Sequence, residues 1–303
     1  MKQLLQAIAL GSLVFSAACK KDPQPAANAQ LIIKFRFDST QVRLNNIGMP
    51  CTVPVGHAAQ NPVFTKMSAH YVELAPTAFT PLGQGKILYR APETTIGGTT
   101  AIDFEKAAFA GNNELFLKVP LTDIKPGKYE WLRISLAYQN ASVKFKVDTI
   151  VNGYPVKSDF TGTLAGFIGF NTYIKNLTIK NESITVNGNR KQGFWAFETL
   201  FSIPGFSMPF TSFGQAPEGS TTVVNPIFNT SPIPPGSCVV TAAFVPGKLN
   251  IIGNETKDII IEASFSTNKS FEWEEVVFDG KWEPSKGERV VDMGIRGMVP
   301  KVL

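Results

Sequence analysis

Short stretches in which apolar and polar residues alternate dominate the chain. Residues 33–38 alternate strictly, and the same period of two recurs over residues 143–151. This alternation is typical of half-buried β-strands, because successive side chains point to opposite faces of a sheet. Further stretches with strand character, most of them flanked by Gly, Pro or Asn, lie at 69–74, 86–90, 114–119, 129–138, 177–186, 238–244 and 258–265.

Two Asn-Gly dipeptides follow strand-like segments and predict β-hairpins. Asn152-Gly153 comes after residues 143–151, and Asn187-Gly188 comes after residues 177–186. The tight type I′ turn needs positive φ at both central residues, which Asn and Gly tolerate. Both positions therefore predict antiparallel pairing of the flanking strands.

Helical periodicity is sparse along the chain. The acidic stretch 271–278 is the one helix candidate, and residues 287–296 fit either a last strand or a short helix. Many short strands between Gly, Pro and Asn-Gly turns predict an all-β fold. We expect an antiparallel β-sandwich, immunoglobulin-like or jelly-roll-like, built as one unit or as two packed halves.

The first nineteen residues have the order of a secretory signal. Lys2 is followed by an apolar run over residues 4–15, and Ser16-Ala17-Ala18 leads into Cys19. A cysteine after two small residues resembles the lipobox of bacterial lipoproteins, although Ser16 stands where that motif usually has Leu. The resemblance implies cleavage before Cys19 and lipid on that residue. The alternative is an ordinary secretory signal with an accidental cysteine.

This reading divides the chain into three parts. Residues 1–18 are the lipoprotein signal peptide, and the polar, proline-bearing residues 19–30 form a flexible tether. Residues 31–303 form the β-sandwich domain, with a possible division in the Gly- and Pro-rich stretch 214–237. A lipidated Cys19 would hold the domain on a membrane without a transmembrane helix, because several acyl chains anchor stably.

The charge pattern argues against nucleic acid as a partner. The formal net charge is +5, and the basic residues are scattered along the chain. Nucleic-acid binders usually gather Lys and Arg on one stripe. With the predicted signal, the expected location is the cell envelope, as an outer-membrane lipoprotein on the periplasmic or the cell-surface face. The partners expected are the membrane, through the N-terminal lipid, and a glycan or an envelope protein.

Two cysteines remain once Cys19 is set aside. Cys51 and Cys238 could form a disulfide in an oxidising compartment. A bridge that closes so long a loop contributes about 4–5 kcal/mol in the chain-entropy model. The alternative is two unrelated buried thiols.

Catalytic and metal-binding motifs are sparse. His57 and His70 are the only histidines, they are far apart in sequence, and they are weak metal candidates. The sequence has no Gly-x-Ser-x-Gly elbow and no phosphate-binding Gly-rich loop. Glu272, Glu274 and Glu275 could serve a hydrolase only if two carboxylates face each other. We predict no catalytic residue and no cofactor.

The densest aromatic stretch spans residues 194–213. Exposed rings there could stack on sugar rings or anchor a protein partner, and the alternative is that they fill the core. Pro204-Gly205 and Pro209 interrupt any helix through this stretch. The candidate binding aromatics are Trp195, Phe206, Phe210 and Phe213, and Trp273 and Trp282 form a second, weaker pair.

Several segments resemble the MbnP-like lipoproteins, a periplasmic family associated with copper handling. The similar features are the opening strand at residues 31–37, the strand at residues 67–74 and the Pro126-Gly127-Lys128 turn that leads into a strand. The resemblance implies a metal-handling role, but the copper ligands of the family cannot be placed on positions of this chain. Lys20-Lys21-Asp22 after the lipobox also resembles envelope lipoproteins of Bacteroidetes.

These observations favour a lipid-anchored, non-enzymatic binding protein of the cell envelope with an unidentified ligand. The first alternative is an MbnP-like copper-handling lipoprotein. The second alternative is an envelope hydrolase that uses dispersed carboxylates.

Overall fold

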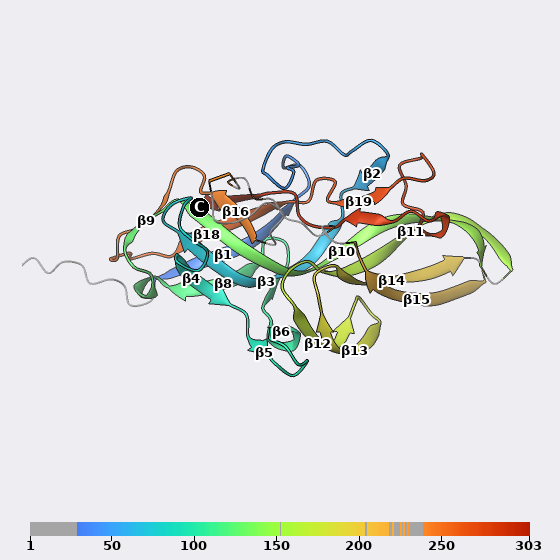
Figure 1. The fold of residues 1–303 in the computed structure, drawn as a ribbon, viewed down its shortest axis with the longest axis horizontal. Coiled ribbons are helices and arrows are strands. Elements are labelled where there is room, and N and C mark those ends of the chain that lie inside the picture. The colour runs from blue at the N-terminus through green and yellow to red at the C-terminus, as the bar shows by residue number, and fades with distance from the viewer. Residues whose placement is uncertain are drawn as a thin grey trace, which may run out of the picture.

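The computed structural model describes residues 29–151, 153–203, 205–217, 220, 225, 227, 229–230 and 239–303. Over these residues the fold is all-β, with mostly antiparallel sheets in a sandwich-like arrangement, so the predicted fold class is confirmed. The predicted signal peptide and most of the tether lie outside the described residues. Figure 1 shows an elongated body with long hairpins at one end of the long axis and β9 (Gly127–Tyr129) near the other.

The largest of the described sheets has eight strands. Its main path runs through β15 (Phe206–Gln215), β14 (Phe194–Ile203), β11 (Tyr154–Phe167), β10 (Trp131–Val151), β3 (Val63–Ala75) and β4 (Lys86–Arg90), with β16 (Val239–Ala243) beside β10 and β7 (Phe109–Ala110) beside β3. The 21-residue strand β10 is rich in β-branched and aromatic residues, which favour extended backbone. Its first half pairs with β3 and β16, and its second half pairs with β11.

A four-stranded sheet makes the second layer of the main core. Its order is β21 (Met298–Val302), β18 (Ile259–Ser266), β1 (Gln30–Asp38) and β8 (Leu115–Pro120), and β1 and β18 are parallel. Leu31, Ile33 and Phe35 alternate inward from β1 and meet Leu132 and Ile134 of β10 in this core. The predicted opening strand is therefore a central strand, buried on its inner face.

Smaller sheets and three single-turn 3₁₀ helices complete the described structure. The smaller sheets are β13 (Ser183–Arg190), β12 (Thr172–Thr178), β6 (Ala101–Asp103) and β5 (Glu93–Thr94); β17 (Leu249–Ile251) with β9; and β2 (His57–Gln60), β19 (Phe271–Glu274) and β20 (Val290–Asp292). The 3₁₀ helices are η1 (Phe104–Lys106), η2 (Leu121–Asp123) and η3 (Pro284–Lys286).

The outer half of the large sheet has an apolar cluster on each face. On one face Tyr138, Phe167 and Phe194 pack with Ile174 and Leu177 of β12. The other face carries Val143, Phe145, Val147, Leu164 and Phe197, which pack with Trp273 and Trp282. In Figure 1, β12 and β13 lie on one side of this part of the sheet, and β2 and β19 lie on the other.

One of the two predicted Asn-Gly hairpins is confirmed. β10 and β11 pair antiparallel from Val151 and Tyr154 onwards, so residues 152–153 connect them. The prediction at Asn187-Gly188 was wrong, because both residues lie inside β13 and the connection between β12 and β13 falls at residues 179–182. Asn187 does have a positive φ of 43°, which it uses within the strand and not in a turn.

The helix predicted at 271–278 is also absent from the structure. Phe271–Glu274 is strand β19, which pairs with β2 and β20. Burial decides the outcome: Phe271, Glu272 and Trp273 are all buried, so tertiary contacts override a weak local helical preference. The Pro-broken aromatic stretch is the hairpin of β14 and β15.

β15 forms one edge of the large sheet, and β14 is its only partner among the described strands. Along an antiparallel pair of strands, residue pairs that exchange backbone hydrogen bonds alternate with pairs that do not. In β14 and β15 we count these pairs from Ile203 and Phe206, the pair next to the connection. Pro209 pairs with Leu200 at a position whose backbone groups face away from β14. A residue without an N–H is tolerated at such an edge position.

The predicted division near residues 214–237 falls largely outside the described residues. Strands before and after that stretch share sheets: β18 pairs with β1 in the small layer, and β16 pairs with β10 in the large one.

Candidate functional site

A cavity of about 560 Å³ lies on the aromatic face of the outer half of the large sheet. Phe145 comes from β10, Trp195, Phe197 and Phe201 come from β14, and Phe210 comes from β15. The strand register places all five side chains on one face of the sheet. Directly paired residues share a face, and Phe197 pairs with Leu164 and Phe201 with Met208. The volume falls within the range of pockets that bind small molecules.

Two glycines leave space for the rings of this wall. A Cβ on Gly162 would lie 2.1 Å from the Phe197 ring, and a Cβ on Gly214 would lie 2.7 Å from the Trp195 ring. Side chains at either position would push the rings off the strand. The glycines therefore let Phe197 and Trp195 lie across the neighbouring strands.

The C-terminal segment 275–290 covers the cavity from the other side. Trp282, Pro284, Ser285, Glu288, Arg289 and Val290 complete the wall. The Trp282 ring lies 6.2 Å from Phe145 and 6.0 Å from Phe197 between centroids, and its Nε1 donates to the Glu288 carbonyl at 3.3 Å. The backbone N–H of Lys146 donates to the Trp282 carbonyl at 2.7 Å, which joins this segment to β10.

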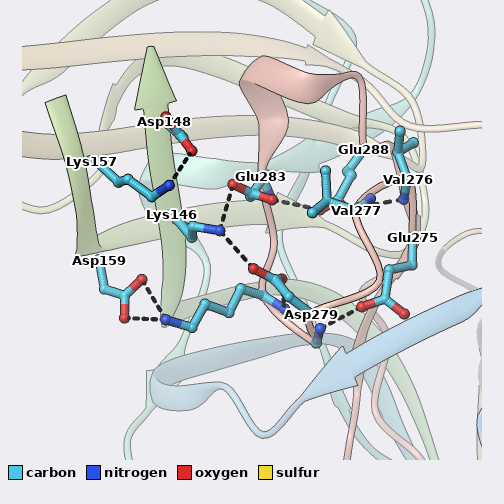
Figure 2. Close-up of polar contacts among 12 residues, drawn as sticks. Lys146, Asp148, Lys157, Asp159, Glu275, Val276, Val277, Asp279, Glu283 and Glu288 are labelled. Carbon is cyan, nitrogen blue, oxygen red and sulfur yellow. Dashed lines mark hydrogen bonds and ion pairs between the residues drawn. The ribbon is translucent and has the colours of Figure 1, made fainter. Parts of the chain in front are cut away.

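Glu288 holds the covering segment in shape (Figure 2). Its Oε1 accepts from the backbone N–H groups of Val276 and Val277 at 3.0 and 3.1 Å, and its Oε2 accepts from that of Glu283 at 2.6 Å. The Glu288 side chain is buried, so these bonds compensate for its lost hydration. One carboxylate thus closes the loop that forms the roof of the pocket.

Lys146 ties the roof to the sheet (Figure 2). Its Nζ contacts Asp279 at 2.6 Å and Glu283 at 3.1 Å. Hydrogen bonds to these two carboxylates raise the pKa of the Lys146 ammonium well above its usual range. The same contact lowers the pKa of the Asp279 carboxyl below its ordinary value of 3.8. Lys146 and Asp279 are therefore charged at neutral pH. We name Lys146, Asp279 and Glu283 the latch.

The candidate aromatics predicted from the sequence divide into two groups. Trp195 and Phe210 line the cavity. Phe206 is half-buried and Phe213 is 63 % exposed, and neither is part of the wall. Of the weaker pair, Trp282 lines the cavity and Trp273 is fully buried in the adjoining core. Phe145, Lys146 and Glu288 were missed, because only the strand register and the covering segment bring them to the pocket.

A second, polar cavity of about 640 Å³ contains other residues singled out in the sequence. Arg43 donates to Cys51 Sγ at 3.2 Å and forms a buried ion pair with Glu272. Glu272 also bonds His57 Nδ1 at 2.6 Å. Burial and the neighbouring Arg43 lower the pKa of Arg296 on the same wall to about 10. Here each carboxylate and thiol is part of a structural network.

Of the cysteines and histidines singled out in the sequence, the structure describes Cys51, His57 and His70. Cys51 forms no disulfide with a described residue; Cys238 and the lipidation candidate Cys19 lie outside the described residues, so both predictions stay open. His70 is buried, bonds Glu93 at 2.7 Å and stacks on Phe170. Within the described ranges, no three His, Cys, Asp or Glu side chains form a group that could hold a metal ion.

Comparisons of the chain with protein-family models, with curated proteins and with solved structures found no match. In the part of the chain that the structure describes, no helix has the length and apolar character needed to cross a membrane.

Proposed function

We propose that this chain is a lipid-anchored binding protein of the cell envelope, which holds an apolar group of its ligand in the aromatic pocket and performs no reaction on it. The observation that supports the proposal most directly is the pocket itself. Six aromatic side chains from three strands and the covering segment converge on one cavity of about 560 Å³. Large, apolar, pre-formed cavities with few polar groups are the usual sites for small ligands.

The contacts that the charged wall residues make with the rest of the protein favour a binding role over a catalytic one. Lys146 is held by the latch, Arg289 pairs with Glu274 at 2.6 Å, and Glu288 accepts three backbone N–H groups. Among the wall residues that the structure describes, each charged group is thus engaged with the protein itself. A general acid or base must instead be able to reach a substrate proton.

The wall composition also favours an apolar ligand group over a sugar. The neutral polar side chains of the wall are few. They are the hydroxyls of Thr149, Ser212 and Ser285, the indole N–H groups of Trp195 and Trp282, and Gln215, whose amide donates to the Gln192 carbonyl at 2.7 Å. A sugar ring needs several hydrogen-bond partners in addition to an aromatic platform, because its hydroxyls lose water on binding. The rings here can instead pack against apolar or flat groups.

The placement of the pocket suits an anchored receptor. The hairpins that carry it lie at one end of the long axis in Figure 1, and β9 lies near the other. The chain enters the described structure near the second end, where the Ala29 carbonyl accepts from Leu121 of η2. An anchor on Cys19 would therefore hold the pocket away from the bilayer.

Binding can be measured with N-phenyl-1-naphthylamine, an uncharged probe whose fluorescence rises in apolar sites. We expect saturable binding to the chain from residue 20 onwards. Phe210→Ala should weaken binding several-fold, because Phe210 is on the wall. Phe213→Ala is the matched control: it removes the same side chain from the same strand outside the wall. Absence of saturable binding, or equal loss in both variants, would refute the pocket as the binding site.

The anchor has its own test. Mass spectrometry of the mature N-terminus of the full chain, expressed in a lipoprotein-processing bacterium, should show lipid on Cys19. The Cys19→Ser variant should leave the membrane fraction. An unmodified N-terminal peptide would remove the anchor and leave the binding proposal standing.

A further inference from the structure

We infer that the ligand of the aromatic pocket is a single-chain amphiphile with a carboxylate head, whose alkyl chain lies among the rings and whose head pairs with Arg289. The inference rests on the proposed function, since it names the ligand class of the same pocket. Three properties of the charged wall residues support it: their signs, their burial and the partners that they already have.

The charged side chains of the pocket wall are unequal in sign. Lys146 and Arg289 are basic, and Glu288 is the one acidic residue among the described residues of the wall. The Glu288 carboxylate is buried and already accepts three backbone N–H groups at 2.6 to 3.1 Å, so its charge is stabilised within the protein. The other wall residues are apolar or neutral. If the ligand carries a charge, this wall therefore favours a negative one.

The two basic side chains differ in how firmly they are held. The side chain of Lys146 is 15 % exposed and contacts two carboxylates of the latch, at 2.6 and 3.1 Å. The side chain of Arg289 is 70 % exposed and has one partner, Glu274, which is itself 42 % exposed. A pair between exposed side chains contributes about 0–1 kcal/mol. Arg289 can therefore exchange its partner for a ligand carboxylate at little cost, whereas Lys146 would have to give up two.

The pair of Arg289 with Glu274 also leaves donors for a ligand. Nε and Nη2 of Arg289 donate to the same oxygen, Glu274 Oε2, at 3.0 and 2.6 Å. Nη1 makes no hydrogen bond within the described part of the chain. A guanidinium has about five N–H donors in a planar fork, so most of them remain for another acceptor. A ligand carboxylate can use them for the two parallel bonds that Glu274 does not form.

The backbone of Arg289 is fixed next to the pocket. The N–H of Glu274 in β19 donates to the Arg289 carbonyl at 3.0 Å, and Val290 pairs with Trp273 in the same ladder. The exposed guanidinium is thus attached to a rigid strand end, at the hydrated edge of an otherwise apolar wall. This arrangement suits an amphiphile, because its chain loses contact with water while its charged head keeps it.

The head is a carboxylate because one guanidinium is offered. The planar fork of arginine matches the two oxygens of a carboxylate. A phosphate monoester carries about two negative charges near neutral pH and needs further cationic donors. The other cation of the wall, Lys146, is held by the latch. The ligand class is therefore a monocarboxylate with an alkyl chain.

The test compares octanoate, octylammonium and octan-1-ol, which share one chain and differ in the head. Each is titrated at pH 7.5 against the chain from residue 20 onwards, with bound N-phenyl-1-naphthylamine as the reporter. We expect octanoate to displace the reporter at a concentration at least tenfold lower than octylammonium. We also expect this preference to shrink when the ionic strength is raised from 0.02 to 0.5 M, since salt screens exposed charges.

Three variants locate the charge that matters. Arg289→Gln should raise the octanoate concentration at least fivefold and leave that of octan-1-ol unchanged, and Arg289→Lys should restore part of the loss. Glu274→Gln removes the competing carboxylate, so octanoate should bind at least twofold more tightly. If the ion pair were merely structural, its loss would weaken binding in Glu274→Gln as in Arg289→Gln. Arg36→Gln, at an exposed arginine of β1 outside the wall, is the charge control and should change neither ligand.

The outcomes separate this inference from the function on which it rests. If the reporter binds but octylammonium competes as well as octanoate, or Arg289→Gln weakens octanoate and octan-1-ol equally, the carboxylate inference is wrong and the binding function stands. If the reporter does not bind at all, both are wrong. If Arg289→Gln does not fold, the comparison of octanoate with octylammonium on the unaltered chain still decides.

Discussion

At the scale of single residues, the pocket depends on two glycines as much as on its aromatic side chains. Gly162 and Gly214 lie under Phe197 and Trp195, on the strands that flank β14. A ring that lies across a glycine on the next strand is held in one orientation and keeps a face free. The same aromatic residues beside bulkier neighbours would stand upright and fill the space that is now the cavity.

Gly162→Ala tests this arrangement. The new Cβ would lie 2.1 Å from the Phe197 ring, so the ring must move, and we expect unfolding in urea to show a loss of about 1–3 kcal/mol. Probe binding in the pocket should weaken as well. Gly188→Ala in β13 is the matched control, because its nearest atom is Arg190 Nη1 at 3.6 Å, an ordinary contact. Equal losses in the two variants would contradict the proposed role of Gly162.

At the scale of elements, two buried glutamates fix two loops in the same way. Glu288 binds three backbone N–H groups of the pocket roof, and Glu198 binds those of Lys180, Asn181 and Glu182 in the connection between β12 and β13. Each carboxylate accepts hydrogen bonds from backbone N–H groups that would bond to a neighbouring strand if the loop were part of a sheet. Such a loop opens locally when its carboxylate is removed, without unfolding of the whole sheet.

The pair provides a reciprocal experiment with hydrogen exchange. In Glu288→Ala the amides of Val276, Val277 and Glu283 should lose protection, and pocket binding should fall. In Glu198→Ala the amides of residues 180–182 should lose protection instead, and pocket binding should persist. Loss of protection across the whole sheet in either variant would show that the glutamate supports the global fold and not one loop.

The latch predicts a dependence of stability on pH. Lys146 lowers the pKa of Asp279 below 3.8 in the folded state, so the ionised carboxyl favours folding. That contribution is complete above the unfolded pKa and is lost as the pH falls through the lower, folded pKa. The difference in unfolding free energy between the unaltered chain and Asp279→Asn should therefore be constant above about pH 5 and shrink below 3.8.

Urea unfolding at pH 7, 5 and 3 measures this difference. Asp123→Asn, which removes a carboxylate that forms no ion pair within the described residues, controls for the change in net charge. A difference for Asp279→Asn that grows in acid would contradict the role assigned to the latch.

The sequence predicted elements better than it predicted their assembly. Alternation identified the strand that became β1 and the second half of β10, because a half-buried strand carries its own pattern. Strand-forming residues next to Gly, Pro or Asn identified parts of β3 and β18. Two local predictions were wrong. At Asn187-Gly188 a turn signal lies inside a strand, and at Phe271–Glu274 burial outweighs the local helical preference. Trp195 and Phe210 could be named as binding candidates, but Phe145, Lys146 and Glu288 could not. Their shared position depends on strand register and on a loop more than a hundred residues away in the chain.

At the scale of the whole molecule, β10 connects the sandwich core with the pocket. Leu132 and Ile134 lie in the main core, whereas Phe145 and Val147 of the same strand lie beside the pocket. The strand is continuous over 21 residues, with partners along its whole length. The two regions should therefore unfold together.

Leu132→Ala tests this coupling. The side chain is fully buried, so its truncation should cost about 2–5 kcal/mol. The urea midpoint should fall by the same amount whether it is followed by circular dichroism or by displacement of the pocket probe. Ile150→Ala, at a residue of β10 that is 69 % exposed, should change stability by less than about 0.5 kcal/mol. Separate midpoints would show two independent units.

Pro209 has a consequence for what happens when many copies of the chain are crowded together. β15 is ten residues long, carries no charge and forms the sheet edge among the described strands, so it could template sheet growth from one molecule to the next. An incoming strand would meet a missing donor near the middle of that edge. This one imino acid therefore discourages polymerisation along the strand that supplies Phe210.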